Sequence, residues 1–284
     1  MPNQFSELFD FHTVEIGAGD AIVYRTTISG TFTIGPKVHG GSLQMVVTHA
    51  ARRALHSLSD PEAGVADDIA AVVVSSDFRN APDPAEVEVS VQIVKRGRTV
   101  SLAHVDVTQG GRVMVSSAVT LARPDHGEPR YRAPLSVDAM PAEPDDDAMW
   151  TEHSPMADVV HLWHAADLAL DPASLPALRG ETGVPEIRGW MRRREAPAGP
   201  DVDFPVLVCD MSPPVVMNLG LFGWAPTVQL TTYLHRQPAS GWLRFAASST
   251  QIGQGMFAED HVVVDSAGAL VAQSRQLALI PAGR

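Results

Sequence analysis

The chain has 284 residues, of which 45% are hydrophobic, and a formal net charge of −12 at pH 7. This length favours two modest cores over one, since single domains commonly hold about 100–200 residues. The acidic charge disfavours nucleic acid as a partner, because a phosphate backbone is bound by a basic surface. No apolar run approaches the roughly 20 residues that cross a bilayer, so we expect no membrane span.

The N-terminus and the cysteine content bear on the compartment. Residues 1–10 lack the basic start and the apolar stretch of a signal peptide. The single cysteine, Cys209, has no partner for an internal disulfide, which fits a reducing environment. We therefore expect a cytoplasmic protein.

The first half of the chain is expected to be one helix among strands. Residues 9–14 and 21–34 are rich in alternating β-branched and apolar positions and predict strands, with Gly30 at a bend or bulge. From Val38 to Leu55, apolar side chains recur at i, i+3 and i+4, which predicts a helix buried along one broad face. Four β-rich tracts then follow between turn signals, at residues 69–78, 85–95, 99–108 and 113–123. This order predicts an α+β unit.

The second half repeats this plan after a change in composition. Residues 125–147 are rich in Pro, Asp, Glu and Ala and predict a linker. Strands are then expected at residues 186–194 and 158–170, although part of the latter tract is equally compatible with a helix. A second helix is expected at 205–219, with a kink beside Asp210 because Pro213 and Pro214 follow. Four closing strands are predicted at residues 227–235, 241–250, 255–265 and 269–280.

The turn positions of the two β-rich tracts align at a nearly constant offset. Phe78-Arg-Asn-Ala-Pro82 matches Leu234-His-Arg-Gln-Pro238, and Gly97 matches Gly253 about 156 residues later. The offset persists to the last hairpin of each tract. An offset that changes so little over so many turns indicates a tandem duplication.

Several short segments carry a family resemblance. They are Val38-His-Gly-Gly41, Gly223-Trp-Ala-Pro-Thr227, Leu234-His-Arg236, Gly241-Trp242 and Leu270-Val-Ala-Gln-Ser-Arg-Gln276. In this order and spacing they resemble the thioesterase-like superfamily, close to the bacterial type II acyl-CoA thioesterases. The resemblance implies a tandem, or double, hotdog fold, in which each half wraps a curved antiparallel sheet around a long helix. We expect an N-terminal hotdog at residues 1–123, a linker at 124–152 and a C-terminal hotdog at 153–284.

The resemblance also implies an activity and a set of site residues. Members of this family hydrolyse a fatty acyl-CoA, or a related acyl thioester, to free acid and CoA without a metal or an organic cofactor. In this family an Asp on the second-half helix, a Thr on the next strand and a Gln on the last strand activate water. These match Asp210, Thr227 and Gln276. Thr231 or Thr232 is an alternative to Thr227, because the loop between helix and strand is short.

The residues themselves support part of this site. Asp210 lies in an apolar run, where a carboxylate is costly unless it is hydrogen-bonded. Its alternative role is to cap a helix beginning near Ser212. Gln276 shares a strand face with small residues, which would leave room for a ligand. Thr227 and Gln276 are equally compatible with ordinary strand positions.

His39, Gly40 and Gly41 are the expected substrate-binding residues. At a helix start, their backbone amides and the positive end of the helix dipole would face an anionic or polarised oxygen. The alternative is a tight strand-to-helix turn that needs glycine, with His39 as a structural histidine. No metal site is predicted, because the sequence lacks His-Glu-x-x-His and paired cysteines. The Gly-x-Ser-x-Gly signature of many serine hydrolases is missing as well.

A small phosphorylated ligand needs only a few local cations, even on an acidic chain. The candidate cations are Arg52, Arg53, Arg79, Arg96, Arg98 and Arg236. Most of these are expected to be ordinary solvated side chains, because charged residues are usually exposed.

Two other functions stay open, because hotdog folds also carry dehydratases and hydratases. His39 from one half and Asp210 from the other would then form an acid–base pair acting on a β-hydroxyacyl or enoyl thioester. A non-catalytic acyl-binding protein is the third alternative. Two chains would also be able to pair through exposed sheet surface into a homodimer or a higher homo-oligomer.

Overall fold

The computed structural model describes residues 4–59, 68–195 and 201–282. Its α-helices are α1 (Gln4–Leu8), α2 (Gly40–Ser57) and α3 (Phe204–Val208). The first-half strands are β1 (His12–Gly17), β2 (Ala21–Thr27), β3 (Thr33–Ile34), β4 (Lys37–Val38), β5 (Ala70–Phe78), β6 (Glu86–Lys95), β7 (Val100–Gln109) and β8 (Arg112–Ala122). The later strands are β9 (Met149–Trp150), β10 (Ala166–Leu170), β11 (Glu186–Arg193), β12 (Thr227–Leu234), β13 (Leu243–Ser248), β14 (Met256–Val264) and β15 (Leu270–Leu279).

Short 3₁₀ helices connect several of these elements. They are η1 (Gly30–Phe32), η2 (Ser136–Ala139), η3 (Thr151–His153), η4 (Pro155–Asp158), η5 (His161–His164), η6 (Pro172–Ser174), η7 (Pro176–Arg179) and η8 (Val215–Leu219). Most of them lie between the linker and β12. The second half therefore carries more irregular chain than the first.

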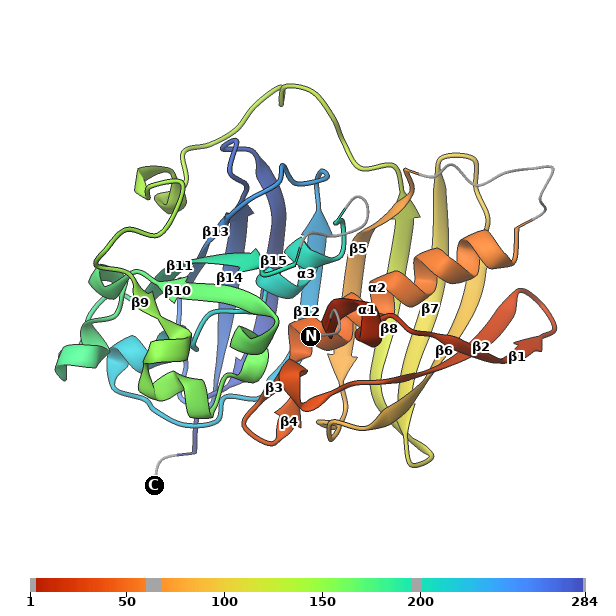
Figure 1. Ribbon diagram of the computed structural model, residues 1–284, viewed down its shortest axis with the longest axis horizontal. Helices are drawn as coiled ribbons and strands as arrows, with labels where there is room; N and C mark the ends of the chain where they lie inside the picture. Colours follow the sequence, from red (N-terminus) through yellow and green to blue (C-terminus); the bar gives the residue numbers. More distant parts are fainter. Residues whose placement is uncertain (1–3, 60–67, 196–200, 283–284) are drawn as a thin grey trace.

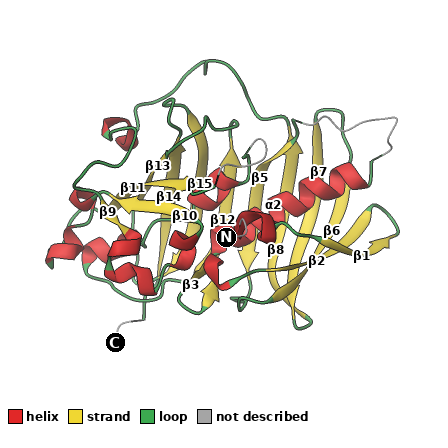
Figure 2. Cartoon of the chain, in the orientation of Figure 1, coloured by secondary structure: helices red, strands yellow, loops and turns green. Residues whose placement is uncertain are grey.

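One antiparallel sheet of 13 strands runs through both halves of the described chain (Figures 1 and 2). Its strand order is β1-β2-β6-β7-β8-β5-β12-β15-β14-β13-β11-β10-β9. The short strands β3 and β4 pair separately. Helix α2 lies across the first-half strands and contacts β5, β6, β7 and β8. The α+β class and the double hotdog fold expected from the sequence are confirmed.

The two halves join where β5 pairs with β12. Ser75 of β5 lies directly opposite Thr231 of β12, and their hydroxyl oxygens are 2.8 Å apart. These residues are separated by 156 positions, which is the offset between the repeats. Each therefore faces its own counterpart across a pseudo-twofold axis, and this register agrees with a tandem duplication.

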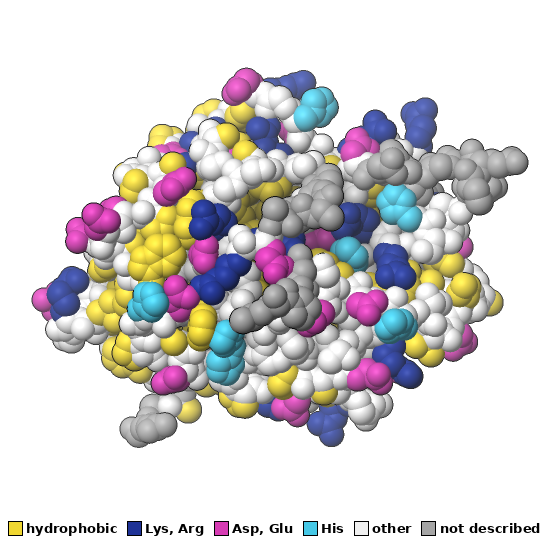
Figure 3. All heavy atoms as spheres, viewed as in Figure 1, with side chains coloured by type: hydrophobic (Ala, Val, Ile, Leu, Met, Phe, Trp, Pro, Cys, Tyr) yellow, Lys and Arg dark blue, Asp and Glu magenta, His cyan; other side chains and the backbone are white. Residues whose placement is uncertain are grey.

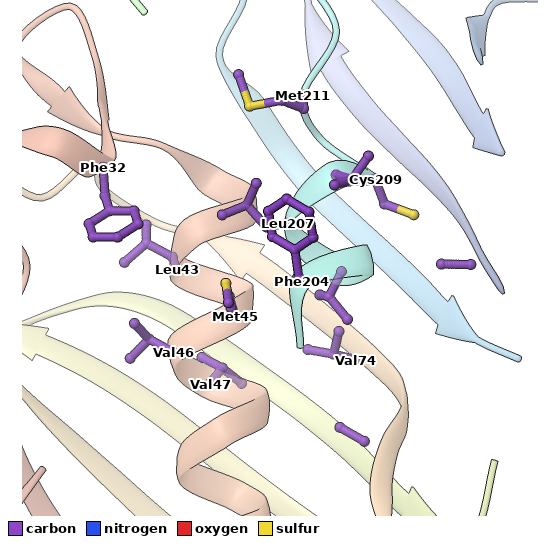
Figure 4. Close-up of a cluster of buried hydrophobic side chains, with 14 of the residues drawn as sticks. Phe32, Leu43, Met45, Val46, Val47, Val74, Phe204, Leu207, Cys209 and Met211 are labelled. Carbon is purple, nitrogen blue, oxygen red and sulfur yellow. The ribbon is translucent and has the colours of Figure 1, made fainter. Parts of the chain in front are cut away.

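Helix α2 is the main buried helix of the fold. His39 is its N-cap, with φ −65° and ψ 138°, and the His39 side chain accepts a hydrogen bond from the Ser42 N–H. Figure 4 shows α2 and α3 within one cluster of buried apolar side chains, and the two helices are in contact, so the central helices of the two halves pack together. Among the described residues, no helix combines the length and the apolarity needed to cross a membrane.

The second helix is broken, whereas the sequence predicted one helix with a kink over residues 205–219. Helix α3 ends at Val208, and the chain resumes only as the 3₁₀ helix η8 at Val215. Pro213 and Pro214 explain the break, because proline lacks the N–H that helix continuation needs. Asp210 lies inside the break, so its side chain leaves from irregular backbone.

Two predicted strands are shorter than expected. The strand predicted at 21–34 divides into β2, the 3₁₀ helix η1 and the short β3, with Gly30 at the start of η1. Of the tract 158–170, only Ala166–Leu170 is a strand, since residues 161–164 form η5. The strand expected at 9–14 lies three residues later, at His12–Gly17.

The later part of the predicted linker packs against the second half. Val137 of η2 is fully buried with Trp190 and Trp242. The Arg244 guanidinium donates to the Met140 carbonyl oxygen at 3.0 Å. Residues from about 135 onward therefore contribute a small core of their own on the second half.

Candidate active site

A cavity of about 660 Å³ opens at the junction of the two halves. Its wall is mostly apolar and comes from both halves, with Val38, Leu43, Phe78, Val160, Leu168, Leu170, Met211 and Met217 among its members. The polar and charged side chains in the wall are His39, Arg79, Asn80, Asp210, Ser212, Thr227, Glu259 and Gln276. An apolar cavity with a few convergent polar groups is the usual form of a small-molecule site.

Asp210 reaches this cavity from the break after α3. Its side chain is 9% exposed and lies at the N-terminus of α2, where the Gly41 N–H donates a hydrogen bond to the carboxylate. Burial raises the pKa of Asp210, and the His39 side chain and the Gly41 N–H oppose this rise. The helix N-terminus thus offsets part of the cost of burying the carboxylate.

The two glycines at the start of α2 allow this close approach. A Cβ added to Gly40 would lie 2.7 Å from Asp210 Oδ2, and one added to Gly41 would lie 2.6 Å from the Leu207 carbonyl oxygen. Both distances are far inside van der Waals contact. Gly40 lines the cavity, whereas Gly41 packs behind Asp210. The glycines thus allow close packing, and the Gly41 backbone amide meets the Asp210 carboxylate, while the substrate-binding role expected from the sequence stays a prediction.

His39 lies beside Asp210 and is 6% exposed. Its Nε2 donates to the Asp210 carbonyl oxygen at 2.8 Å and lies 3.3 Å from Asp210 Oδ2. Its Nδ1 is 3.3 Å from the Ser42 nitrogen and 3.2 Å from Ser42 Oγ. Both ring nitrogens are thus engaged, one in the N-cap of α2 and the other in a contact between the two halves.

Thr227 and Gln276 meet in the wall of the same cavity. Thr227 Oγ1 donates to Gln276 Oε1 at 2.7 Å. The alternative threonines lie elsewhere: Thr231 contacts Ser75 at the seam, and Thr232 donates to Gln44 of α2 at 2.7 Å. Of these three threonines, only Thr227 lines the cavity.

The three predicted catalytic residues therefore share one cavity. Thr227 and Gln276 form a hydrogen-bonded pair, and Asp210 is held separately by the start of α2. In the described part of the chain, no hydrogen bond joins Asp210 directly to that pair. The carboxylate and the pair are thus anchored independently in the wall of one cavity.

Glu259 of β14 is hydrogen-bonded to Gln276 of this pair and was not predicted from the sequence. Its side chain is 1% exposed and lines the cavity. Gln276 Nε2 donates to Glu259 Oε1 at 2.9 Å, and the Val215 N–H donates to Oε2 at 2.9 Å. Burial raises the pKa of Glu259 to about 7, and the charge of nearby Asp210 adds to the rise.

Ser212 and His261 surround the same carboxylate. Ser212 Oγ donates to Glu259 Oε1 at 3.3 Å and lies 3.0 Å from His261 Nε2. Burial lowers the pKa of His261 to about 3, so its imidazole is neutral near pH 7. A usable sequence signal existed, because alternation along β14 places Glu259 and His261 on the same buried face as Phe257 and Val263.

The first half has apolar residues where this network lies in the second half. In the sheet, Thr227 pairs with Ala278 and Glu259 pairs with Gln276. The corresponding pairs of the first half are Ala71 with Leu121 and Ala103 with Val119. Only the second-half copy of these positions thus carries polar groups.

Arg79 is the one arginine among the six candidate cations that lines the described cavity. Arg52 instead pairs with buried Asp203 at 2.6 Å, Arg96 pairs with Asp20, and Arg236 binds a backbone carbonyl. On the face in Figure 3, Lys and Arg side chains are interspersed with Asp and Glu. Of the six candidates, Arg79 thus supplies the positive charge beside the cavity.

Comparison with known families follows the two halves of the chain. Residues 28–122 match the acyl-CoA thioesterase N-terminal domain, and residues 135–280 match the acyl-CoA thioesterase C-terminal domain. The fold and the matched domains define a double hotdog thioester hydrolase that acts on an acyl thioester. The chain belongs to the acyl-CoA thioesterase family, as its sequence resemblance implied.

Individual relatives agree with this family. The chain is 39% identical over 277 residues to the uncharacterized protein Rv0499 of Mycobacterium tuberculosis, covering 92% of this chain and 91% of that protein. The crystal structure of a candidate thioesterase II from Thermobifida fusca is 30% identical, with a TM-score of 0.80 and coverage of 100% of this chain and 98% of that one.

More distant structures share the fold. The acyl-CoA thioesterase II TesB2 of Mycobacterium marinum is 19% identical, with a TM-score of 0.69 and 98% coverage of both chains. The dehydratase domain of the CurF module of curacin polyketide synthase is 13% identical, with a TM-score of 0.59 and coverage of 98% of this chain and 99% of that one. At these identities the likeness extends to the fold alone.

Proposed function

We propose that this chain hydrolyses a fatty acyl-CoA to free acid and CoA, with Asp210 as the base that activates water and Thr227 and Gln276 as the groups that orient it. The observation that carries the proposal is the convergence of Asp210 with the hydrogen-bonded Thr227–Gln276 pair on one cavity between the halves. Thioester hydrolysis needs a positioned base and oriented polar groups around the attacking water.

The geometry suits Asp210 as a proton acceptor. Burial makes its carboxylate a stronger base than a solvated one, while the Gly41 N–H and His39 favour its ionised form. The water oxygen attacks the carbonyl carbon as one water proton passes to Asp210. Collapse of the tetrahedral intermediate breaks the carbon–sulfur bond and releases CoA, whose thiolate takes the proton back from Asp210 and so restores the carboxylate.

His39, Gly40 and Gly41 have different parts in this proposal. Gly41 and His39 hold Asp210, so they act on the base rather than on the substrate. Gly40 lines the cavity at the N-terminus of α2 and is the candidate for contact with the thioester carbonyl.

The cavity wall supports an acyl-CoA as the substrate. Its apolar side chains, among them Leu168 and Met217, would cover the hydrocarbon chain, and Arg79 offers a positive charge for a CoA phosphate. A carrier-protein thioester would lack the nucleotide phosphates. We propose lipid metabolism in the cytoplasm as the setting of this activity.

A dehydratase or hydratase is the second candidate, because His39 Nε2 and Asp210 Oδ2 lie 3.3 Å apart across the two halves. Such a pair would move protons on a β-hydroxyacyl or enoyl thioester. The engagement of both His39 ring nitrogens in the cap of α2 argues against it. The Thr227–Gln276–Glu259 network would also have no part in that reaction.

Product analysis tests these functions directly. The protein would be incubated with saturated acyl-CoAs of increasing length, and with enoyl-CoA and β-hydroxyacyl-CoA. Free CoA from the saturated substrates supports hydrolysis. Water addition or loss without free CoA would replace the proposal with a dehydratase or hydratase, and binding without turnover would replace it with an acyl-binding protein.

Self-association is a separate proposal. The outward face of the second-half sheet exposes Val228, Met256, Leu277 and Leu279 between 36% and 52%. Pairing of two chains through this face into a homodimer would cover these side chains. Light scattering on the parent and on Leu277→Lys measures it, and a monomeric parent would end this proposal without affecting the hydrolase.

A further inference from the structure

Glu259 and Gln276 are direct partners in the sheet, and both side chains face the cavity. They lie opposite each other in the β14–β15 register. Gln276 Nε2 donates to Glu259 Oε1 at 2.9 Å, while Gln276 Oε1 accepts the Thr227 hydroxyl at 2.7 Å. Both ends of the carboxamide are therefore used, and the Glu259 carboxylate is the group at its donor end.

An ionised carboxylate permits only one orientation of this carboxamide. A carboxylate accepts hydrogen bonds and cannot donate, so the NH₂ end of Gln276 must face Glu259. The flipped carboxamide would bring its oxygen against the Glu259 oxygens. With the observed orientation, the Thr227 hydroxyl proton is committed to Gln276 and the lone pairs of Thr227 Oγ1 are available to the cavity.

The orientation of Thr227 matters for the attacking water. If Thr227 Oγ1 accepts one proton of the water and Asp210 accepts the other, the lone pair of the water oxygen is left for the carbonyl carbon. In the flipped state, Gln276 would donate to Thr227, whose proton would turn toward the cavity. Thr227 would then bind the lone pair that must attack.

We propose that Glu259 is a positioning residue, which locks the Gln276 carboxamide so that Thr227 presents an acceptor to the hydrolytic water. This proposal rests on the proposed function above, because it assigns Glu259 a role in the same reaction. Glu259 acts through Gln276 and Thr227, and the backbone N–H of Val215 fixes its second oxygen at 2.9 Å.

The surroundings of Glu259 make this lock sensitive to pH. The titratable groups that face it are Asp210, whose charge disfavours its ionisation, and His261, whose Nε2 lies 3.7 Å away and is neutral near pH 7. His39 lies beyond Asp210. Among the described residues, no Lys or Arg forms an ion pair with Glu259. Since burial sets its pKa at about 7, a protonated Glu259 at lower pH would donate to Gln276 and release the lock.

The test compares kcat, KM and the pH profile of the parent with Glu259→Gln. A carboxamide at position 259 no longer fixes the orientation of Gln276, so kcat is expected to fall about 10- to 100-fold with KM within about twofold. The step in kcat near pH 7 should disappear. Asp260→Asn is the matched control, because Asp260 pairs with Arg275 on the exposed face of the same strand, and its pH profile should follow the parent.

A double variant, Glu259→Gln with Gln276→Glu, separates the lock from general damage. The carboxylate now at position 276 can only accept hydrogen bonds, so it would accept one from the Thr227 hydroxyl and one from the NH₂ group of the carboxamide at position 259. The oxygen of that carboxamide would accept the hydrogen bond from the Val215 N–H. We expect kcat to recover at least about fivefold over Glu259→Gln. Circular dichroism checks that all variants are folded. If the single variant is unfolded, a folded double variant still tests the role of Glu259.

Two results would overturn the role of Glu259. One is a folded Glu259→Gln variant with the kcat and the pH profile of the parent. The other is a double variant that is no faster than the single one. Asp210→Asn in the same assay keeps this outcome distinct from failure of the hydrolase proposal. An inactive Asp210→Asn beside a fully active Glu259→Gln removes only the positioning role, whereas an active Asp210→Asn removes the proposed mechanism.

Discussion

His39 Nε2 and Asp210 Oδ2 lie 3.3 Å apart although the two residues come from different halves of the chain. The start of the first-half helix therefore supports the carboxylate of the second half. This arrangement makes the proposed site composite, because the proposed base, Asp210, belongs to one hotdog and its backbone and imidazole partners belong to the other.

Replacing His39 by Asn is expected to leave hydrolysis within about tenfold of the parent. Asn is among the best N-cap residues, so it can retain the start of α2 while removing the imidazole. Rates of CoA release by His39→Asn and by the parent give the comparison. Loss of all turnover in a folded His39→Asn variant would instead favour acid–base chemistry by the imidazole, as a dehydratase or hydratase would require.

Thr227→Ala is expected to slow CoA release about 10- to 100-fold, because the water loses one of its orienting groups. Thr231→Ala is the matched control, since the Thr231 hydroxyl contacts Ser75 at the seam and lies outside the cavity wall. Its rate should stay close to that of the parent. If the two variants were equally impaired, Thr227 would have no special part in the reaction.

Gly41→Ala is expected to lower the free energy of unfolding by about 1–3 kcal/mol, as overpacked sites do. The added Cβ would lie 2.6 Å from the Leu207 carbonyl oxygen and 2.9 Å from Asp210 Cβ. The control is Gly30→Ala, whose Cβ would meet no atom within 4 Å. Urea unfolding measures both. Equal stability of the two variants would contradict the close approach of α2 to the second half.

Glu259→Gln should change the pH dependence of stability with a definite sign. The pKa of Glu259 is raised by burial from 4.5 to about 7, so the folded chain holds this proton more tightly than the unfolded chain. The free energy of unfolding of the parent should therefore fall relative to Glu259→Gln as the pH rises from about 4.5 to 7. The change is at most about 3.5 kcal/mol, given ~1.36 kcal/mol for each pKa unit. Parallel pH curves in urea unfolding would contradict the raised pKa.

Regular elements were predictable because their signals are local and repeated. The apolar spacing from Val38 to Leu55 placed α2, and turn residues placed the long strands and the offset of 156 that reappears between Ser75 and Thr231. The break of the second helix was only half predicted. Pro213 and Pro214 indicated a kink, but whether the chain resumes as a helix depends on packing that the local sequence does not encode.

The three proposed catalytic residues were indicated only where a family pattern existed. The resemblance indicated Asp210, Thr227 and Gln276, and these side chains do line one cavity. Glu259 was missed because its importance depends on the register that brings β14 beside β15, and a single strand cannot reveal its partner. The proximity of the α2 start to Asp210 was foreseen in the pairing of His39 with Asp210 across the halves, but the hydrogen bond from the Gly41 N–H to that carboxylate was not.

The most direct test of the account is the rate of CoA release by Asp210→Asn, measured beside the parent on the acyl-CoA that the parent hydrolyses fastest. Asn keeps the shape of the side chain and removes the base. We predict a folded variant whose kcat is lower by at least about 100-fold, the contribution expected of a general base. A folded Asp210→Asn variant that releases CoA at the rate of the parent would contradict the central claim that Asp210 activates the water.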